Sequence, residues 1–595
     1  MDETTWQRSS LQPFRFFLLS ILIGVVAGLG AVAFRGLIAF FHNLLFLGKL
    51  SVVYDANVHT SPSPWGLGVI FVPVVGAIGV TFLVQNFAPE AKGHGVPEVM
   101  DAIYYHKGII RPVVALIKSI ASALSIGSGG SVGREGPIVQ IGSSFGSTVG
   151  QILRMPTWQR IILIAAGTGA GIAATFNTPI GGVLFAYELM LHEVSVKTIV
   201  PVAIATVTAT YIGQIFFGPY PSFMIPSFEM LYFHIDNPLL LLSYASLGIL
   251  LGAASAVYIK SIYVFEDFFD QRIKRNPYLR HMIGMLLVGI IIYLLMASLG
   301  YYYVEGVGYA TLQDIFTDRL SEAKLLGLLF ILKLFATSVT LGSGASGGIF
   351  SPSLYLGATL GGTFGLILRQ IFPELPIDPP AFAVAGMAGM TGGATGAPMA
   401  AIVMIFEMTL NYNVIIPMTI TVAIGYGVRT MLSKESIYTM KLARRGHIIP
   451  QTLQANFQQL RRARELMDTH FMTVPASMPL RELIRMGPKK NDALAFLVEN
   501  RGGEILGVVS KDTLVETLGE SNETTTLEEV AHEGYVTVLE ETTLFAIAER
   551  MRSRNVSIAL VTNGSAAAQA SNVKGLITRQ QIGGAIVEAN DFFSE

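Results

Sequence analysis

The chain has 595 residues, of which 51% are hydrophobic and only 14% are charged, and its formal net charge is −1. Soluble globular proteins are normally about one-quarter charged, so this deficit predicts an integral membrane protein that contacts a lipid bilayer. The sequence contains no cysteine, which excludes disulfides and thiolate metal sites, and the near-neutral charge gives no indication of a nucleic-acid partner.

After a short segment, 1–13, apolar stretches follow one another as far as about residue 432. About 20 apolar residues span a bilayer as a helix, and several of these stretches are shorter, longer or interrupted by glycine and proline. Nothing alternates at period two over the length of a barrel strand, so we expect a polytopic α-helical membrane protein with broken and re-entrant helices. The stretches are 14–47, 66–87, 110–127, 158–190, 195–217, 238–265, 281–300, 324–341, 353–372, 381–410 and 413–432.

Two glycine-rich stretches, Gly127–Pro137 and Gly342–Pro352, interrupt apolar segments and resemble each other residue by residue. Glycine leaves backbone N–H groups uncovered, and proline presets the first turn of the helix that follows. Helix N-termini carry free N–H groups and a positive dipole end, so two of them facing one place would bind an anion. The matched pairs are Gly127/Gly342, Ser128/Ser343, Gly129/Gly344, Ser131/Ser346, Gly133/Gly348 and Pro137/Pro352.

The repeat extends well beyond these two stretches, into a first half at about 14–217 and a second at about 238–440. Two homologous halves with paired broken helices indicate a transport site at the interface of the repeats. Small residues alone would suit ordinary packing of membrane helices, but shared lysine, proline and glutamate positions favour true repetition. The further matched pairs are Gly93/Gly306, Gly95/Gly308, Lys118/Lys333, Gly167/Gly386, Pro179/Pro398 and Glu188/Glu407.

Beyond Leu432 the composition becomes that of a soluble protein. A basic linker at 441–462 is typical of the cytoplasmic side of a membrane, and we expect both termini in the cytoplasm. Two β-α-β-like units then follow at 463–522 and 523–595, which predicts a soluble α/β pair. The matched positions of the two units are Thr473/Thr537, Leu480/Leu544, Ala495/Ala559 and Gly507–Ser510/Gly575–Thr578.

Glu135 is the first candidate site residue, because it stands just before Pro137 at the expected start of a half-helix. A carboxylate there could itself occupy the anion position, and protonation or displacement would vacate it. An ionisable residue at membrane depth is expensive unless it is used, which favours a gate over an ordinary acidic helix start. Arg134 could be a partner or a lure for the anion, and the sequence leaves both open.

Two further groups flank the expected anion position. Ile349 and Phe350 precede Pro352, so their N–H groups could point to an anion while their side chains insulate its pathway. His94 lies between two glycines and before Pro97, where an imidazole could donate to an anion or titrate near neutral pH. A lone histidine in a loop is as often structural, so both interpretations stay open.

Together these residues resemble the CLC family of chloride channels and chloride/proton exchangers. The likeness rests on Gly133–Pro137, Gly348–Pro352, Gly93–Pro97 and Tyr438 in this order, and it covers essentially the whole chain. It implies a homodimer with one pore per subunit, two inverted halves, and a cytoplasmic pair of CBS domains at the C-terminus. It also implies that Glu135 is the external gating glutamate and that chloride is the transported ligand.

By the same likeness, the N–H groups of Ile349 and Phe350 and the hydroxyl of Tyr438 look like chloride ligands. His94 stands where the family usually has serine, and Leu189 stands where its exchangers carry an internal proton-transfer glutamate. The candidate replacements for that relay are Glu188 and Glu193. The predicted anion-binding residues are His94, Arg134, Gly136, Ile349, Phe350 and Tyr438.

The CBS pair departs from the family in its nucleotide site. Nucleotide-binding members usually carry an aspartate three residues after a strand-end Ser or Thr, where it accepts from ribose hydroxyls. Here Thr513 follows Ser510 and Gln581 follows Thr578, so the charge-assisted hydrogen bond is lost. An adenine nucleotide is therefore allowed but not favoured, and no cofactor is required.

The sequence favours passive chloride conduction gated by Glu135, with the CBS pair as a candidate regulator. The alternative is chloride/proton exchange in which Glu193, His192 or water replaces the missing proton acceptor. A fluoride exporter is a third reading, against which Tyr438 and Gly348–Pro352 argue. An enzyme is disfavoured, because the membrane part shows no nucleophile–base pair and no metal-ligand cluster.

Overall fold

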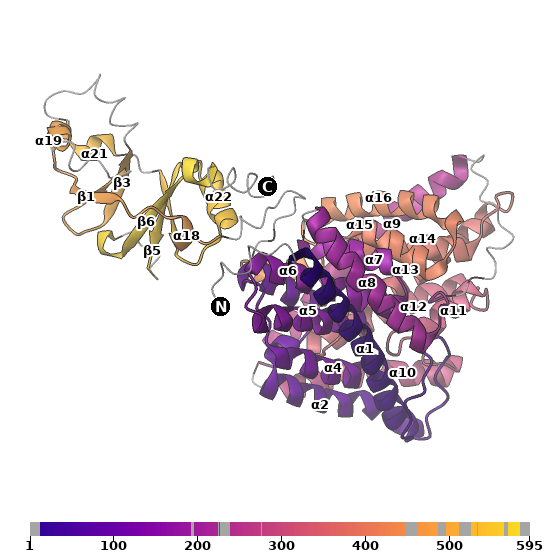
Figure 1. The fold of residues 1–595 in the computed structure, drawn as a ribbon. Coiled ribbons are helices and arrows are strands. Elements are labelled where there is room, and N and C mark those ends of the chain that lie inside the picture. The colour runs from indigo at the N-terminus through magenta and orange to yellow at the C-terminus, as the bar shows by residue number, and fades with distance from the viewer. Residues whose placement is uncertain are drawn as a thin grey trace. The chain divides into compact units, whose positions relative to one another are not determined.

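The computed structural model describes residues 12–191, 195–223, 225, 238–274, 276–447, 449, 461–485, 495–510, 525–531, 534–563 and 569–583. The chain divides into two compact units, Met1–Ile449 and Pro450–Glu595. The first unit is helical, and the second contains every strand found among the described residues (Figure 1).

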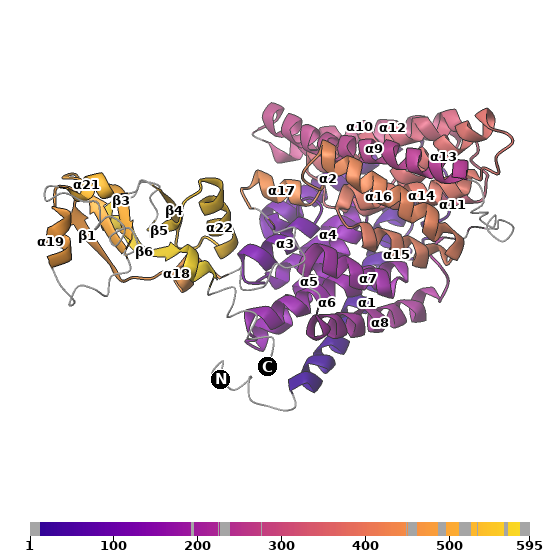
Figure 2. The same ribbon diagram turned by 90° about the horizontal axis from the view of Figure 1, so that it is seen from above.

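The helices of the first unit fall into two series of the same order, as the sequence repeat predicts. Equivalent helices pack on equivalent partners. For example, α5 lies against α6 in the first series, and α13 lies against α14 in the second. Figure 2 shows α9, α10, α12 and α13 along one side of this unit and α1, α6 and α8 along the other. The first series is α1 (Gln12–Leu47), α2 (Val72–Phe87), α3 (Val96–Tyr105), α4 (Pro112–Gly127), α5 (Glu135–Ile152), α6 (Thr157–Phe176), α7 (Pro179–Ala186) and α8 (Val196–Phe217). The second is α9 (Pro238–Arg272), α10 (Pro277–Leu299), α11 (Tyr309–Phe316), α12 (Ala323–Ser343), α13 (Phe350–Ile371), α14 (Pro379–Thr395), α15 (Pro398–Thr409) and α16 (Ile415–Leu432).

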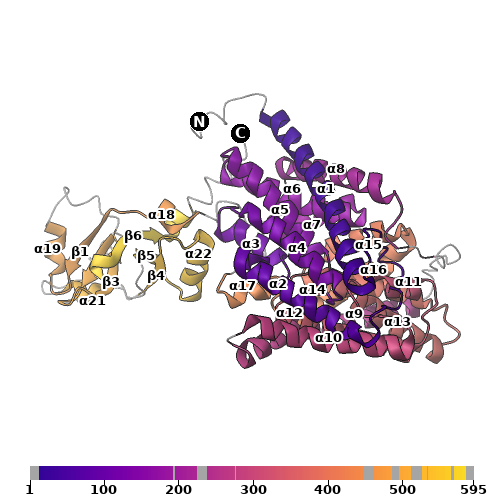
Figure 3. The ribbon, with the colours of Figure 1, turned by 90° about the horizontal axis from the view of Figure 1, so that it is seen from below.

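Eight helices within the described residues are long and apolar enough to cross a membrane. The longest in the first series is α1, which runs across that series and packs on α4, α6 and α8 (Figure 3). The eight spans are α1, α2 with the preceding turn η2 (Gly66–Phe71), α6, α8, α9, α10, α12, and α16 with the preceding turn η6 (Tyr412–Val414).

Two apolar stretches that the sequence outlines as continuous are each broken into two helices. Stretch 158–190 breaks between α6 and α7 at Asn177, whose φ is +61°. Stretch 381–410 breaks at the equivalent place, between α14 and α15, where Gly396 has a φ of +79°. A left-handed residue ends a helix, and the proline that follows begins the next one.

The second unit contains two three-stranded sheets of identical topology. In each, the first two strands are parallel and the third is antiparallel to the second. The sheets pack together through Leu497, Leu560 and Leu576. The strands are β1 (Phe471–Pro475), β2 (Ala495–Glu499), β3 (Ile505–Ser510), β4 (Tyr535–Leu539), β5 (Ile558–Thr562) and β6 (Val573–Thr578), with helices α19 (Leu480–Arg485) and α22 (Leu544–Ser553).

Two short helices cross between the halves of this unit. Helix α18 (Ala463–Leu466) precedes β1, yet Ala463 belongs to the core of the second half. Helix α21 (Leu527–Val530) precedes β4, yet its first N–H donates to the Met478 carbonyl of the first half at 2.9 Å. The sequence boundary between 522 and 523 therefore does not separate the two halves in space.

Candidate functional site

Three glycine-rich loops meet at the interface of the two repeats. Gly133 and Gly348 exchange N–H···O bonds of 2.7 and 2.6 Å. The Gly93 N–H donates to the Ala345 carbonyl at 3.0 Å, and the Gly347 N–H donates to the Gly93 carbonyl at 3.2 Å. These loops lead directly into α3, α5 and α13, so the N-termini of three helices converge there.

Glu135, the first residue of α5, places its carboxylate at the N-terminus of α13. The side chain is buried, and its Oε2 accepts from the Ser351 N–H at 3.1 Å. Its Oε1 accepts from the Tyr309 hydroxyl at 2.9 Å and from the Ser351 hydroxyl. Since Ser351 lies in the first turn of α13, the carboxylate of one repeat occupies an anion position on a helix of the other.

Three other predicted anion ligands are Ile349, Phe350 and Tyr438. Ile349 is the N-cap residue of α13 and Phe350 is its first residue, and both are buried. The first N–H groups of a helix have no intrahelical partner, so these two are available to an anion. Tyr438 is buried at the N-cap of α17 (Thr439–Arg444), within range of the charge of Glu135.

Arg134 lies against aromatic rings. Its guanidinium carbon is 5.2 Å from the ring centroid of Tyr309 and 5.7 Å from that of Phe176. One guanidinium nitrogen also donates to the Thr175 carbonyl at 3.4 Å. Of the two roles left open by the sequence, this arrangement fits a fixed cation beside the anion position better than a direct partner of Glu135.

His94 is buried, and neither of its ring nitrogens has a hydrogen-bond partner among the described residues. The loop that carries it is held by Lys118, whose Nζ donates to the Ala91 and Gly93 carbonyls at 2.9 and 2.7 Å. The equivalent Lys333 does the same in the second half, at the Val304 and Gly306 carbonyls. The paired lysines found in the sequence therefore hold the two loops through their backbone carbonyls.

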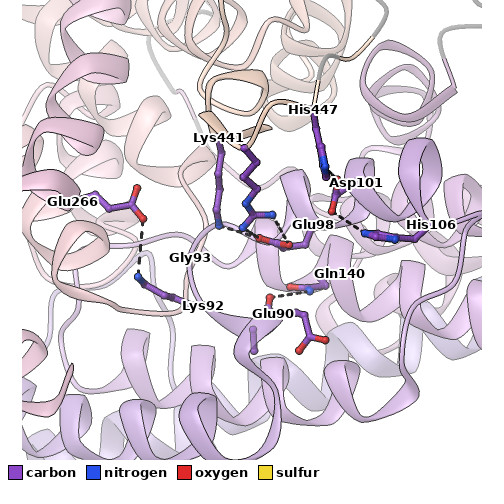
Figure 4. Close-up of polar contacts among 12 residues, drawn as sticks. Glu90, Lys92, Gly93, Glu98, Asp101, His106, Gln140, Glu266, Lys441 and His447 are labelled. Carbon is purple, nitrogen blue, oxygen red and sulfur yellow. Dashed lines mark hydrogen bonds and ion pairs between the residues drawn. The ribbon is translucent and has the colours of Figure 1, made fainter. Parts of the chain in front are cut away.

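A charged cluster joins the segment after Tyr438 to the helix after His94 (Figure 4). Glu98 pairs with Lys441 at 3.0 Å and with Arg445 at 2.8 Å, and the Asp101 carboxylate lies 2.5 Å from His447 Nδ1. Glu98 belongs to α3, which at 10 residues is too short to span a membrane. Burial alone would favour neutral Glu98, but the two cations outweigh it and lower its pKa to about 2. Ion pairs therefore link α3 to α17 and to the residues that directly follow it.

Glu188 lies in the π-turn η4 (Tyr187–Leu191), and its carboxylate caps a helix of the other repeat. It accepts from the Met399 and Ala400 N–H groups at 3.0 and 2.7 Å, at the start of α15. Glu407 makes the equivalent contacts in the opposite direction. It accepts from the Ile180 and Gly181 N–H groups at the start of α7, at 3.1 and 2.7 Å. The geometry therefore gives Glu188 a capping role, whereas Glu193, the other candidate relay, lies outside the described residues.

We expect Glu188→Gln to behave as the loss of a cap. An amide has one acceptor oxygen in place of two, so either the Met399 or the Ala400 N–H loses its partner, which destabilises the fold by about 1 kcal/mol. Glu407→Gln is the matched control, because Glu407 makes the equivalent contacts. Chloride and proton fluxes and the thermal midpoint should fall together in both variants. Loss of proton movement alone, and only in Glu188→Gln, would assign the relay to Glu188.

The candidate nucleotide site of the second unit is only partly within the described residues. Ser510 ends β3, and Thr513 lies outside the described residues. Gln581 Oε1 accepts from the Thr578 N–H at 2.8 Å and from the Thr578 hydroxyl at 3.3 Å. The acceptor that a ribose hydroxyl would need is therefore already bonded to its own chain.

Sequence reasoning did not single out Tyr309 or the side chain of Ser351. Ser351 lies inside the quoted motif Gly348–Pro352, where attention falls on the backbone. Tyr309 follows Gly308, the second glycine of the repeated Gly-x-Gly pair, so the repeat marked its loop. What the sequence could not supply is the contact across the repeats that brings its hydroxyl to Glu135.

The chain matches the family described as "Voltage gated chloride channel" over residues 75–430 and the CBS domain over residues 463–520. It is 31% identical to a putative chloride channel protein ClcB-like of Ralstonia nicotianae, over 71% of this chain and 95% of that protein. It is 32% identical to the H(+)/Cl(−) exchange transporter ClcA of Yersinia pseudotuberculosis, over 73% and 88%. The crystal structure of a slow cyanobacterial Cl−/H+ antiporter superimposes with a TM-score of 0.61 at 26% identity, over 72% and 98%.

Proposed function

This chain belongs to the voltage-gated chloride channel (CLC) family, and we propose that it exchanges chloride for protons, with Glu135 as the shared gate. The observation that carries the proposal is the position of the Glu135 carboxylate, bonded to the Ser351 N–H at the start of α13. One place then serves the carboxylate and the transported anion in turn.

The exchange cycle follows from this competition. An ionised carboxylate is held by the N–H group and the positive dipole end of α13, so it excludes the anion. A proton neutralises the carboxylate and weakens that attraction, so the side chain leaves and chloride takes its place. When the carboxylate returns, the chloride must move on and the proton must leave. Anion and proton are then moved in opposite directions by one side chain.

The proposal revises the reading that the sequence favoured. The sequence favoured passive conduction because Leu189 cannot carry a proton at the position where the family's exchangers have a glutamate. Two of the similar proteins favour exchange instead: ClcA is named an exchange transporter, and the cyanobacterial protein is named an antiporter. Exchange here then requires another proton carrier between the cytoplasm and Glu135. His192 and Glu193 are the candidates, both outside the described residues, and water is the third.

We propose the same assembly that the sequence led us to expect, namely a homodimer with one pathway per subunit and a cytoplasmic CBS pair. The basic linker supports the cytoplasmic placement. The cluster of Glu98, Lys441 and Arg445 supports regulation of transport by the CBS pair. A movement of the chain after α17 would displace α3, and with it the loop that carries His94. Proton uptake driven by a chloride gradient in liposomes tests the exchange itself.

We expect ATP to bind the protein weakly or not at all. Titration calorimetry on the purified full-length chain should show no heat at micromolar ATP, because Gln581 already bonds to Thr578. Gln581→Asp would restore a carboxylate at that position and should strengthen any binding. Wild-type binding near 1 μM, roughly −8 kcal/mol, would show that other contacts compensate.

A further inference from the structure

Tyr309 reaches the gate from the repeat opposite to Glu135. It is the first residue of α11 and follows Gly308, whose φ is +80°. The loop before it is fixed by the buried Lys333, which donates to the Gly306 carbonyl at 2.7 Å. In the first repeat the equivalent place, after Gly95, is held by Val96, so only the second repeat presents a hydroxyl there.

The Tyr309 side chain packs on both sides of its ring and places its hydroxyl at the carboxylate. The ring meets Phe223 edge to face, with centroids 5.3 Å apart, and Arg134 covers it at 5.2 Å. The hydroxyl donates to Glu135 Oε1 at 2.9 Å and lies 2.6 Å from the Ser351 hydroxyl. Both side chains are buried, where the dielectric is low, so their hydrogen bond is stronger than one exposed to water.

We propose that Tyr309 is a positioning residue that latches the gate, its hydroxyl holding the Glu135 carboxylate in the anion position. The inference rests on the proposed function, because it takes Glu135 as the group that must move. Each opening then requires the bond between these two side chains to break. The latch acts mainly when the carboxylate is ionised, since a hydrogen bond to a charged acceptor is the stronger one.

Other ionisable groups face the same carboxylate, and they belong to different elements. Tyr258 of α9 and Tyr438 before α17 lie within range of its charge, and Arg134 precedes it in the chain. Tyr258 donates to the Ile349 carbonyl at 3.3 Å. Among the described residues, the Glu135 carboxylate accepts hydrogen bonds from the Tyr309 hydroxyl and from the N–H and hydroxyl of Ser351. Those two side chains are therefore the ones to change.

Tyr309→Phe tests the latch, because it removes the hydroxyl and keeps the packed ring. In liposomes, we expect chloride efflux at alkaline external pH to rise roughly 5- to 30-fold, the factor for one or two ordinary hydrogen bonds. The pH profile should become shallower, since the ionised carboxylate keeps its bonds to Ser351 but loses the bond to Tyr309. Tyr302→Phe is the matched control. It also loses a buried hydroxyl, but one that accepts from the Ser63 N–H away from the gate.

A second background separates the latch from a structural role. In Glu135→Ala there is no carboxylate to hold, so adding Tyr309→Phe should leave efflux unchanged. If Tyr309→Phe fails to fold, Ser351→Ala is the substitute test. It removes the other hydroxyl bonded to Glu135 and should also speed efflux. Wild-type efflux and pH response in Tyr309→Phe, or an equal change in both backgrounds, would overturn the proposal. Efflux without proton movement would refute exchange alone and leave the latch standing.

Discussion

Glu135→Ala should transport chloride at the wild-type rate or faster, and its flux should no longer depend on external pH. The carboxylate accepts hydrogen bonds from the Ser351 N–H and two hydroxyls, at the place that we propose it shares with the anion. Removing it deletes the competitor for that position, and with it the group whose charge the external proton changes. We expect both opening and proton coupling to be lost as regulated steps, because both depend on this one side chain.

The measurement is chloride efflux from liposomes of purified protein, recorded with a chloride electrode over a series of external pH values. Glu90→Gln is the control, because Glu90 is a partly exposed carboxylate that pairs with Arg111 at 2.6 Å. That variant should keep the wild-type pH response. A pH response that persists unchanged in Glu135→Ala would show that the sensor lies elsewhere.

Gly136→Ala should abolish transport and lower the yield of folded protein. A methyl group at this position would overlap the His94 carbonyl oxygen and come within 3.1 Å of the Gly348 Cα. All of these atoms are backbone, so no side-chain rotation relieves the overlap, and the three loops must separate. Overpacking of this kind costs about 3 kcal/mol or more, a large part of the stability of an ordinary domain.

Gly427→Ala provides the matched control within a helix of the same unit. A methyl group there meets nothing within 4 Å, so the substitution should be neutral or stabilise α16 by up to about 1 kcal/mol. Monodispersity by size exclusion and the thermal midpoint report folding separately from flux. Normal flux in Gly136→Ala would mean that the loops around His94 are not packed as described.

The sequence could predict the parts of the site that depend on backbone conformation, because glycine and proline mark where helices start. Pro137 and Pro352 each close a glycine-rich stretch that interrupts apolar sequence, a pattern that predicts a helix restarting inside a membrane. The repeat then placed Glu135 and Phe350 at two such starts, and the structure brings these starts together. Lys118 was found as a matched position, but its role as a clamp on loop carbonyls appears only in the fold.

The parts that could not be predicted are contacts made across the repeats. Nothing near Glu188 in the sequence indicates that its carboxylate caps α15, because the partners are backbone groups that carry no sequence signal. Nothing distinguishes Tyr309 from other tyrosines in the sequence until the fold brings its hydroxyl to Glu135. The break at Asn177 was missed for a different reason, since asparagine tolerates the left-handed region without requiring it.

The exchange of chloride for protons is tested most directly by loading liposomes with chloride, diluting them into chloride-poor buffer, and following pH with a trapped dye. As chloride leaves, we expect protons to enter against an opposing pH gradient, and this uphill movement to vanish in Glu135→Ala while chloride still flows. An uncoupler applied at the end should collapse the pH difference, which excludes a simple leak. Rapid chloride efflux with no uphill proton movement in the wild-type protein would contradict exchange and establish passive conduction.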